Sequence, residues 1–150
     1  MILGFKQYFP DGSSTNFKEQ ILDDTKIHTI RAGDRWRKGL SIEMATGVRT
    51  KHYNQFNIDR PDLQVCKNVQ DIFMTYDYRL RIIVAEVDSY MGGDVFDLNG
   101  KQLIRLAVND GFPDYSFFDR FFYNAIKENE KLTGHAWFSG QIVHWTDLKY

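Results

Sequence analysis

The segment Lys26-Ile27-His28-Thr29-Ile30-Arg31 carries the residue types and spacing best suited to chemistry in this chain. A lysine whose pKa is lowered by burial can take the proton of a hydroxyl nucleophile, so Lys26 and Thr29 form a candidate base and nucleophile. In a regular strand these two side chains would point to opposite faces. They can converge only if the backbone turns or bulges between them, which a junction between a helix and a strand would allow.

Spacing alone does not establish this chemistry, because K-x-x-T is a common tetrapeptide. The structural interpretation is simpler: Thr29 is a β-branched strand residue, Lys26 is solvated, and His28 is a satisfied polar group. Within a strand, Thr29 and Arg31 share one face while His28 and Ile30 share the other. Both interpretations remain open at this point.

The elements that must position this segment indicate one α+β domain over residues 1–150. Leu40, Ile42 and Met44 alternate with smaller or polar residues, as expected of a half-buried strand. A small closed or partly open antiparallel barrel with helices segregated in sequence is the natural architecture. We expect strands over 2–9, 26–31, 40–45, 69–76, 80–87 and 138–145, helices over 15–23, 99–108 and from 114 onward, a polar loop over 48–64, and a turn at Gly92-Gly93.

Two of the expected helices begin with a capping-box pattern, in which a polar N-cap residue is followed three positions later by Glu or Gln. These pairs are Asn16 with Glu19 and Asn99 with Gln102. The second pair is flanked by Leu98 and Leu103, which adds a hydrophobic staple.

Composition limits the class of protein. A chain of 150 residues with 43% hydrophobic and 15% aromatic content can bury a proper core without a disulfide. The single cysteine, Cys66, fits a reducing compartment. There is no apolar run of about 18 residues and no secretory leader pattern at the start, so we expect a cytoplasmic protein with no membrane partner.

The net charge of −1 conceals a segregation of charge along the sequence. Residues 26–52 hold seven basic and two acidic residues, and residues 86–130 hold nine acidic and four basic residues. A basic segment of this kind favours an anionic partner, although a solvated face explains it more simply.

The order of several short motifs resembles that of the ASCH domain family, which belongs to the PUA-like superfamily of small β-barrels with flanking helices. The resemblance covers most of the chain, with a longer insertion around 48–64. The motifs that carry it are Phe17…Ile21-Leu22, Lys26 to Arg31, Gly33-Asp34-Arg35-Trp36, Gly39, Leu106-Ala107…Asp110-Gly111-Phe112…Phe118…Phe122, and Gly140 to Thr146.

Within that family, the K-x-x-T-x-R spacing of Lys26, Thr29 and Arg31 is similar to that of the bacterial N4-acetylcytidine amidohydrolases. Many other members have Glu where Thr29 stands and Gly where Asp24 stands. The resemblance implies a catalytic set of the lysine, the threonine and a later glutamate, whose position falls on Asp110 here. Aspartate is one methylene shorter than glutamate.

We therefore expect a protein that acts on or binds a modified nucleoside or RNA, with Lys26, Thr29 and Asp110 as catalytic candidates. Arg31 and Arg35 are candidates for binding substrate, and Trp36 and Tyr53 for stacking on a base, although core packing explains the aromatic residues more simply. A non-catalytic RNA-binding module and a ribonuclease remain alternatives. No metal-binding or nucleotide-loop motif occurs, so we expect no metal and no cofactor.

Overall fold

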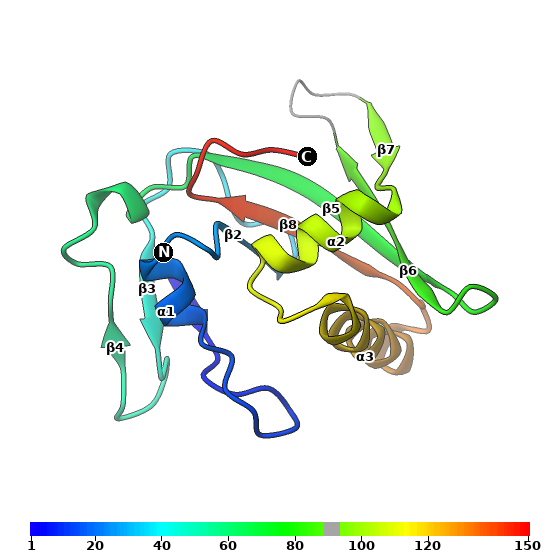
Figure 1. Ribbon diagram of the computed structural model, residues 1–150, viewed down its shortest axis with the longest axis horizontal. Helices are drawn as coiled ribbons and strands as arrows, with labels where there is room; N and C mark the ends of the chain where they lie inside the picture. Colours follow the sequence, from blue (N-terminus) through cyan, green and yellow to red (C-terminus); the bar gives the residue numbers. More distant parts are fainter. Residues whose placement is uncertain (89–93) are drawn as a thin grey trace.

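The computed structural model describes residues 1–88 and 94–150 and has a mixed α+β architecture, as the sequence predicts (Figure 1). The expected turn at Gly92-Gly93 lies outside the described residues. The elements, in chain order, are β1 (Ile2–Phe5), α1 (Phe17–Leu22), β2 (His28–Ala32), β3 (Glu43–Thr46), β4 (Asn54–Gln55), the 3₁₀ helix η1 (Pro61–Leu63), β5 (Asn68–Asp77), β6 (Ile82–Asp88), β7 (Val95–Asp97), α2 (Gly100–Asn109), α3 (Tyr115–Thr133) and β8 (Phe138–His144).

Five of these strands form an antiparallel sheet in the order β2-β8-β5-β6-β7. Helices α2 and α3 lie across one face of it (Figure 1). The alternation along each strand turns an apolar set toward these helices, so that Ile30, Ile72, Ile83 and Ile142 join Leu106 of α2 and the phenylalanines of α3 in one core. Strand β2 is an edge strand of this sheet: β8 is paired along one side of it, and no strand of the sheet is paired along its other side in the part of the chain that the structure describes.

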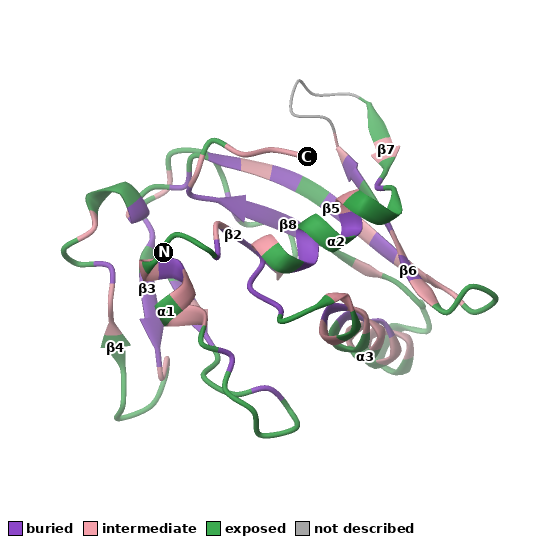
Figure 2. Cartoon of the chain, in the orientation of Figure 1, coloured by how far each residue is buried: buried purple, intermediate pink, exposed green. Residues whose placement is uncertain are grey.

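The other sheet has three strands in the order β1-β3-β4. Strand β1 pairs with β3 in parallel, so the expectation of antiparallel strands throughout is wrong at this pair. A second core, which includes Leu3, Met44, Trp36 and Trp145, fills the space between this sheet and the far face of the larger one, to which Val143 contributes. The purple segments of Figure 2 follow both cores. In the part of the chain that the structure describes, the two sheets remain separate hydrogen-bonded units.

Phe17, at the start of α1, packs against both cores. Its ring makes edge contacts with Phe5 of β1 at a centroid distance of 6.5 Å and with Phe112 after α2 at 6.2 Å. Phe9 completes the group, 5.8 Å from Phe17. The two cores, and the two sheets that they pack against, are therefore joined by aromatic contacts around α1.

The capping patterns have different outcomes. Asn99 caps α2 as predicted, since its side chain accepts from the N–H of Gln102 while the Gln102 side chain accepts from the N–H of Asn99. The prediction for Asn16 is wrong: its backbone is left-handed, with φ of 51°, and its side chain makes no cap hydrogen bond. Its amide oxygen accepts from the Ser14 hydroxyl instead, which removes it from the helix N-terminus.

The polar segment 48–64 is more ordered than the expected loop, because it contains β4 and η1. Asn57, which is fully buried, accounts for much of this order. Its side chain accepts from the N–H of Met44 and donates to the carbonyls of Ile42 and Leu63, so it ties the insertion to β3. A polar residue used this way gives no apolar periodicity, so the sequence pattern could not reveal it.

Among residues 1–88 and 94–150, no helix combines the length and the apolar character needed to cross a bilayer.

Candidate functional site

The candidate site lies along the free edge of β2, where the chain leaving α2 runs beside it. The N–H of Ile27 donates to the carbonyl of Asn109, so the residues on either side of this contact, Lys26 and Asp110, are brought together. Lys26 precedes β2, which begins at His28, and is not constrained by the alternation of the strand. The backbone of Asp24 is left-handed, with φ of 65°, and reverses the chain between α1 and Lys26.

Lys26 and Asp110 form a buried ion pair, with 2.5 Å between Nζ and Oδ1. Their exposed fractions are 1% and 4%. The same amine donates to the main-chain carbonyl of Asp110 and, at 3.0 Å, to the carbonyl of His28. All three donor positions of the ammonium are thus used, which is what a buried lysine requires.

Burial shifts the pKa values of both partners toward the neutral forms. It lowers the pKa of Lys26 to about 8, because removal from water disfavours the ammonium more than Asp110 stabilises it, and the nearby Arg31 charge adds to the lowering. Burial likewise raises the pKa of Asp110, against the opposing influence of Lys26 and Arg31. A lysine with this pKa has an accessible neutral form near physiological pH.

Thr29, the second residue of β2, is 5% exposed. It pairs with Val143 of β8, and its side chain shares the strand face of Arg31, toward the second core. The register between β2 and β8 is continuous from His28 to Ala32, so β2 has no bulge at Thr29. The contact from Lys26 Nζ to the His28 carbonyl brings the amine to the peptide unit that leads into Thr29.

No hydrogen bond joins Lys26 to the Thr29 hydroxyl within the described residues; the amine is occupied by His28 and Asp110. The ground state therefore holds the base beside the candidate nucleophile's backbone, and proton transfer would need the amine to turn toward the side chain.

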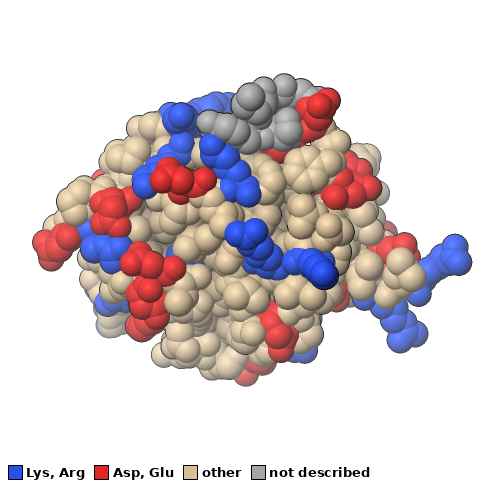
Figure 3. Space-filling model, turned by 45° about the horizontal axis from the view of Figure 1, so that its top comes forward, with Lys and Arg blue, Asp and Glu red and all other residues tan. Residues whose placement is uncertain are grey.

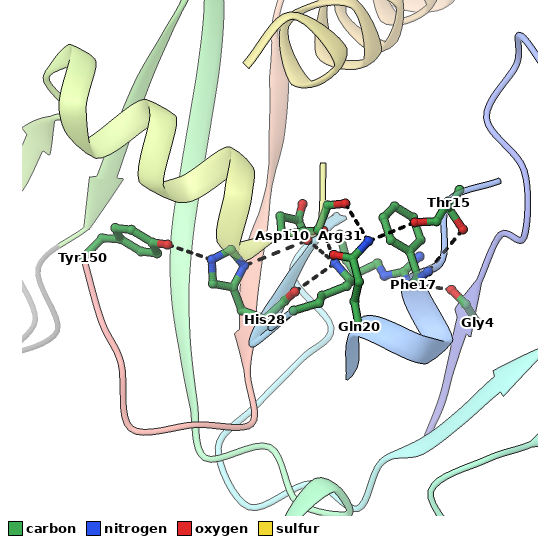
Figure 4. Close-up of polar contacts among 10 residues, drawn as sticks. Gly4, Thr15, Phe17, Gln20, His28, Arg31, Asp110 and Tyr150 are labelled. Atoms are coloured by element: carbon green, nitrogen blue, oxygen red, sulfur yellow. Dashed lines mark hydrogen bonds and ion pairs between the residues drawn. The ribbon is translucent and has the colours of Figure 1, made fainter. Parts of the chain in front are cut away.

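Arg31 borders an open hollow of about 480 Å³ between residues 4–8 and the turn at Gly47 and Val48. Its guanidinium donates to the carbonyl of Gly4 at 2.5 Å (Figure 4) and lies 5.2 Å from the ring centroid of Phe5. Its Nε is buried and has no hydrogen-bond partner within the described residues. A guanidinium that lines an open hollow can receive a carbonyl or an anion there.

Two aromatic rings lie close to the Lys26 amine, and one of them, Phe5, also lines this hollow. The Lys26 Nζ lies 4.7 Å from the ring centroid of Phe17 and 5.8 Å from that of Phe5. Gln20 of α1 closes the other side, where its Nε2 donates to the carbonyls of Thr15 and Gly111 (Figure 4). The polar pair is therefore covered by α1 and the end of β1.

Gly111 allows this close packing. Its φ is +87°, and a Cβ at this position would lie 2.9 Å from Cδ of Lys26 and 3.0 Å from Oε1 of Gln20. Both the backbone conformation and the space require glycine directly after Asp110.

The remaining candidates lie apart from the pair. Trp36 is fully buried in the second core, so the interpretation as core packing is correct and a stacking surface is excluded in this conformation. Arg35 is exposed, with its guanidinium 6.0 Å from the Trp36 ring. Tyr53 is 43% exposed and does not line the hollow at Arg31.

Sequence reasoning missed the part played by the end of the chain. His28 was expected to be a satisfied structural group, but only its Nε2 is bonded, to the hydroxyl of Tyr150 at 2.8 Å. Its Nδ1 has no hydrogen bond within the described chain and lies 3.9 Å from Oδ1 of Asp110. No local signal marks Tyr150, because this contact spans 122 residues.

Comparisons of the chain with protein-family models, with curated proteins and with solved structures find no match.

Proposed function

We propose that this protein hydrolyses an exocyclic amide of a modified nucleoside of the N4-acetylcytidine type, with Thr29 as nucleophile and Lys26 as base. The observation that supports this most directly is the buried Lys26–Asp110 pair, whose amine reaches the His28 carbonyl in the peptide unit that leads into Thr29. Covalent amide hydrolysis requires a hydroxyl nucleophile and a base that can take its proton, and a lysine that loses its proton near neutral pH can be that base once its amine turns toward the hydroxyl.

In this mechanism the neutral amine of Lys26 takes the proton of the Thr29 hydroxyl as Oγ1 attacks the carbonyl carbon of the amide. The C–N bond then breaks, and the ammonium of Lys26 returns the proton to the departing exocyclic nitrogen. Water, deprotonated in turn by Lys26, hydrolyses the Thr29 ester and releases the carboxylic acid. With a pKa of about 8, roughly a tenth of Lys26 is neutral at pH 7.

Asp110 directs the amine and offsets its charge in the protonated steps. Both the carboxylate and the main-chain carbonyl of Asp110 accept from Nζ, so they hold the amine in one resting position before it turns toward Thr29. The shorter side chain of aspartate, compared with the glutamate of the resembling family, suits this arrangement because the backbone of Asp110 itself lies against Lys26. Arg31 would stabilise the oxyanion or hold the nucleobase carbonyl.

Access is part of the proposal, because the pair is nearly inaccessible in this conformation. The ligand would occupy the hollow at Arg31 and displace the rings of Phe5 and Phe17 from Lys26. Arg35 and Tyr53, both exposed, remain candidates for contacts with the sugar or base. We also propose that the two sheets, which pack through the second core, are an open form of a PUA-like barrel.

The test incubates the purified protein with N4-acetylcytidine and follows the release of cytidine and acetate. We expect turnover by the natural chain, none by Thr29→Ala or Lys26→Met, and partial activity in Thr29→Ser, which keeps the hydroxyl. Thr25→Ala is the matched control, because Thr25 is exposed and hydrogen-bonds to Asp23. Full activity in either Thr29→Ala or Lys26→Met would refute the mechanism.

The alternative is an RNA-binding module, which the exposed Arg35, Arg37 and Lys38 favour. Against it, the face drawn in Figure 3 intersperses Lys and Arg with Asp and Glu. Binding through phosphates would weaken steeply with salt, whereas hydrolysis of a neutral nucleoside should hardly respond. A salt titration of both activities therefore separates the two functions. Ribonuclease chemistry has less support, since burial lowers the pKa of His28 well below 6.5 and that of His144 to about 4.

A further inference from the structure

His28 is a fully buried histidine whose two ring nitrogens face different groups. Its Nε2 lies 2.8 Å from the hydroxyl of Tyr150, and its Nδ1 is directed at Asp110 (Figure 4). The separation of 3.9 Å from Nδ1 to Oδ1 is too long for a hydrogen bond but short enough for attraction between a dipole and a charge. A buried polar atom with no hydrogen bond requires an explanation, and its position beside the candidate site offers one.

Tyr150 is held firmly against the same region. Its N–H donates to Oε1 of Gln70 at 2.9 Å, and its carbonyl accepts from Nε2 of Gln70 at 2.9 Å. Gln70 lies in β5, so the tail is fixed to the centre of the larger sheet. The phenol oxygen also accepts from Nδ2 of Asn109 at 2.8 Å, and Asn109 directly precedes Asp110.

These contacts determine where the protons of His28 lie. Burial raises the pKa of Tyr150 and lowers that of His28 well below 6.5, so both side chains are neutral at pH 7. Because the phenol oxygen already accepts from Asn109, its own proton is free to be donated to Nε2 of His28. A neutral imidazole that accepts at Nε2 carries its proton on Nδ1, the nitrogen that faces Asp110.

The opposite arrangement is unfavourable. A proton on Nε2 would leave the lone pair of Nδ1 directed at the Asp110 carboxylate, and it would leave the phenol proton without the acceptor that Nε2 provides. Rotation of the Asn109 amide could supply that acceptor, but the repulsion between Nδ1 and Asp110 would remain.

We propose that His28 is a positioning residue for Asp110, held by Tyr150 as the tautomer whose Nδ1–H points at the carboxylate. This inference rests on the proposed function, in which Asp110 directs the Lys26 amine. Lys26 gains and loses a proton during the reaction, so the attraction it exerts on Asp110 changes. A neutral N–H donor on another side keeps the carboxylate in place when Lys26 is uncharged, as the outer partners of catalytic groups commonly do.

The charged and titratable neighbours of His28 allow this role. Lys26 and Asp110 face it across the edge of β2, and His144 of β8 lies 5.5 Å away between ring centroids. His144 bonds through Nε2 to Gln70, is neutral at pH 7 and does not compete for Tyr150. Beyond these, the charge of Arg105 in α2 lowers the pKa of Tyr150, and the charge of Lys149 lowers the pKa of His144.

The first test is NMR of the full chain labelled with ¹⁵N-histidine, which distinguishes the two tautomers by the shifts of the ring nitrogens and needs no catalytic activity. We expect His28 as a single Nδ1–H tautomer that stays neutral well below pH 6.5. In Tyr150→Phe, which keeps the ring but removes the donor to Nε2, the Nε2 resonance should shift and the Nδ1–H tautomer should become less dominant, while Tyr78→Phe, at an exposed position, should leave the spectrum unchanged. An Nε2–H tautomer in the natural chain, or no change in Tyr150→Phe, would overturn the proposal.

The second test measures the pH profile of N4-acetylcytidine hydrolysis. We expect Tyr150→Phe to lower kcat by about threefold to tenfold with KM unchanged, the size of a modest interaction with a charged group. The midpoint of the profile should move to higher pH. Wherever the Nδ1 lone pair of His28 replaces the N–H beside Asp110, the potential near Lys26 becomes more negative, which raises the pKa of Lys26. Unchanged kcat and midpoint in an active enzyme would contradict positioning. If no hydrolysis occurs at all, the proposed function fails, but the NMR measurement of the His28 tautomer still tests the inference about His28.

Discussion

Lys26 and Asp110, which are 84 residues apart in the sequence, meet as a buried ion pair with 2.5 Å between Nζ and Oδ1. The contact joins the segment after α1 to the C-terminal end of α2 and covers the free edge of β2. An uncovered strand edge exposes unpaired backbone groups, so the pair contributes to the fold as well as to the candidate chemistry. This dual role makes stability measurements informative about the site.

Removal of one partner should be far more harmful than removal of both. Lys26→Met and Asp110→Leu each leave an uncompensated buried group, so we expect each to lower the free energy of unfolding by about 3–5 kcal/mol. The double variant should lose much less than the sum. Urea denaturation of the three variants measures this. Arg60→Met, which removes an exposed ion pair with Asp24, is the control and should change stability little. Additive losses in the double variant would show that the two residues do not interact.

Stability should increase with pH in the alkaline range because of Lys26. Its pKa is about 8 in the folded state against 10.5 for an ordinary lysine, so between these values the unfolded chain binds more protons. The free energy of unfolding therefore rises across this window, by at most about 3 kcal/mol. The effect is measured as the difference between the natural chain and Lys26→Met, in which other titrating groups cancel. Asp110 has a raised pKa and predicts the opposite slope in acid, just above pH 3.8. A flat difference curve from pH 8 to 10.5 would contradict the assigned shift.

Gly111 should tolerate substitution worse than another glycine with the same backbone. Gly111→Ala combines a positive φ with contacts to Lys26 and Gln20, and we expect a loss of about 3 kcal/mol. Gly134 has a φ of +79° with open space around its Cβ direction, so Gly134→Ala should lose about 1 kcal/mol. Thermal unfolding of the two variants compares them directly. Equal losses would show that Lys26 is not held against Gly111.

Cys66 should be unreactive in the folded protein. Its side chain is fully buried, and burial raises the pKa of the thiol to about 11, so little thiolate forms at pH 8. We expect iodoacetamide to modify it slowly in the native state and rapidly in urea, as followed by mass spectrometry. Rapid labelling without denaturant would indicate that the second core opens readily, since Cys66 lies in that core.

The sequence predicts the elements well where periodicity and capping agree. The box at Asn99 and Gln102 locates the start of α2 to the residue, and the phenylalanine spacing identifies α3. The capping pattern of Asn16 fails because its side chain has a closer partner in Ser14. Local sequence does not distinguish these two cases.

The candidate site is less predictable than the elements. The spacing of Lys26 and Thr29 identifies the segment, and the family resemblance adds Asp110, which the structure brings to Lys26. The burial of Trp36 and the contact of Tyr150 with His28 depend on packing between distant segments. Such contacts follow from tertiary structure and carry no periodic signal.

Phe17 connects access to the Lys26 amine with the packing of the two cores. Its ring packs against both cores and lies over the Lys26 amine. Any motion that admits a ligand to Lys26 therefore loosens the packing of Phe17 between the two cores. Entry and release should be slow events coupled to partial unfolding around α1, so that residence time of a ligand, rather than its affinity, reports on the strength of the aromatic junction.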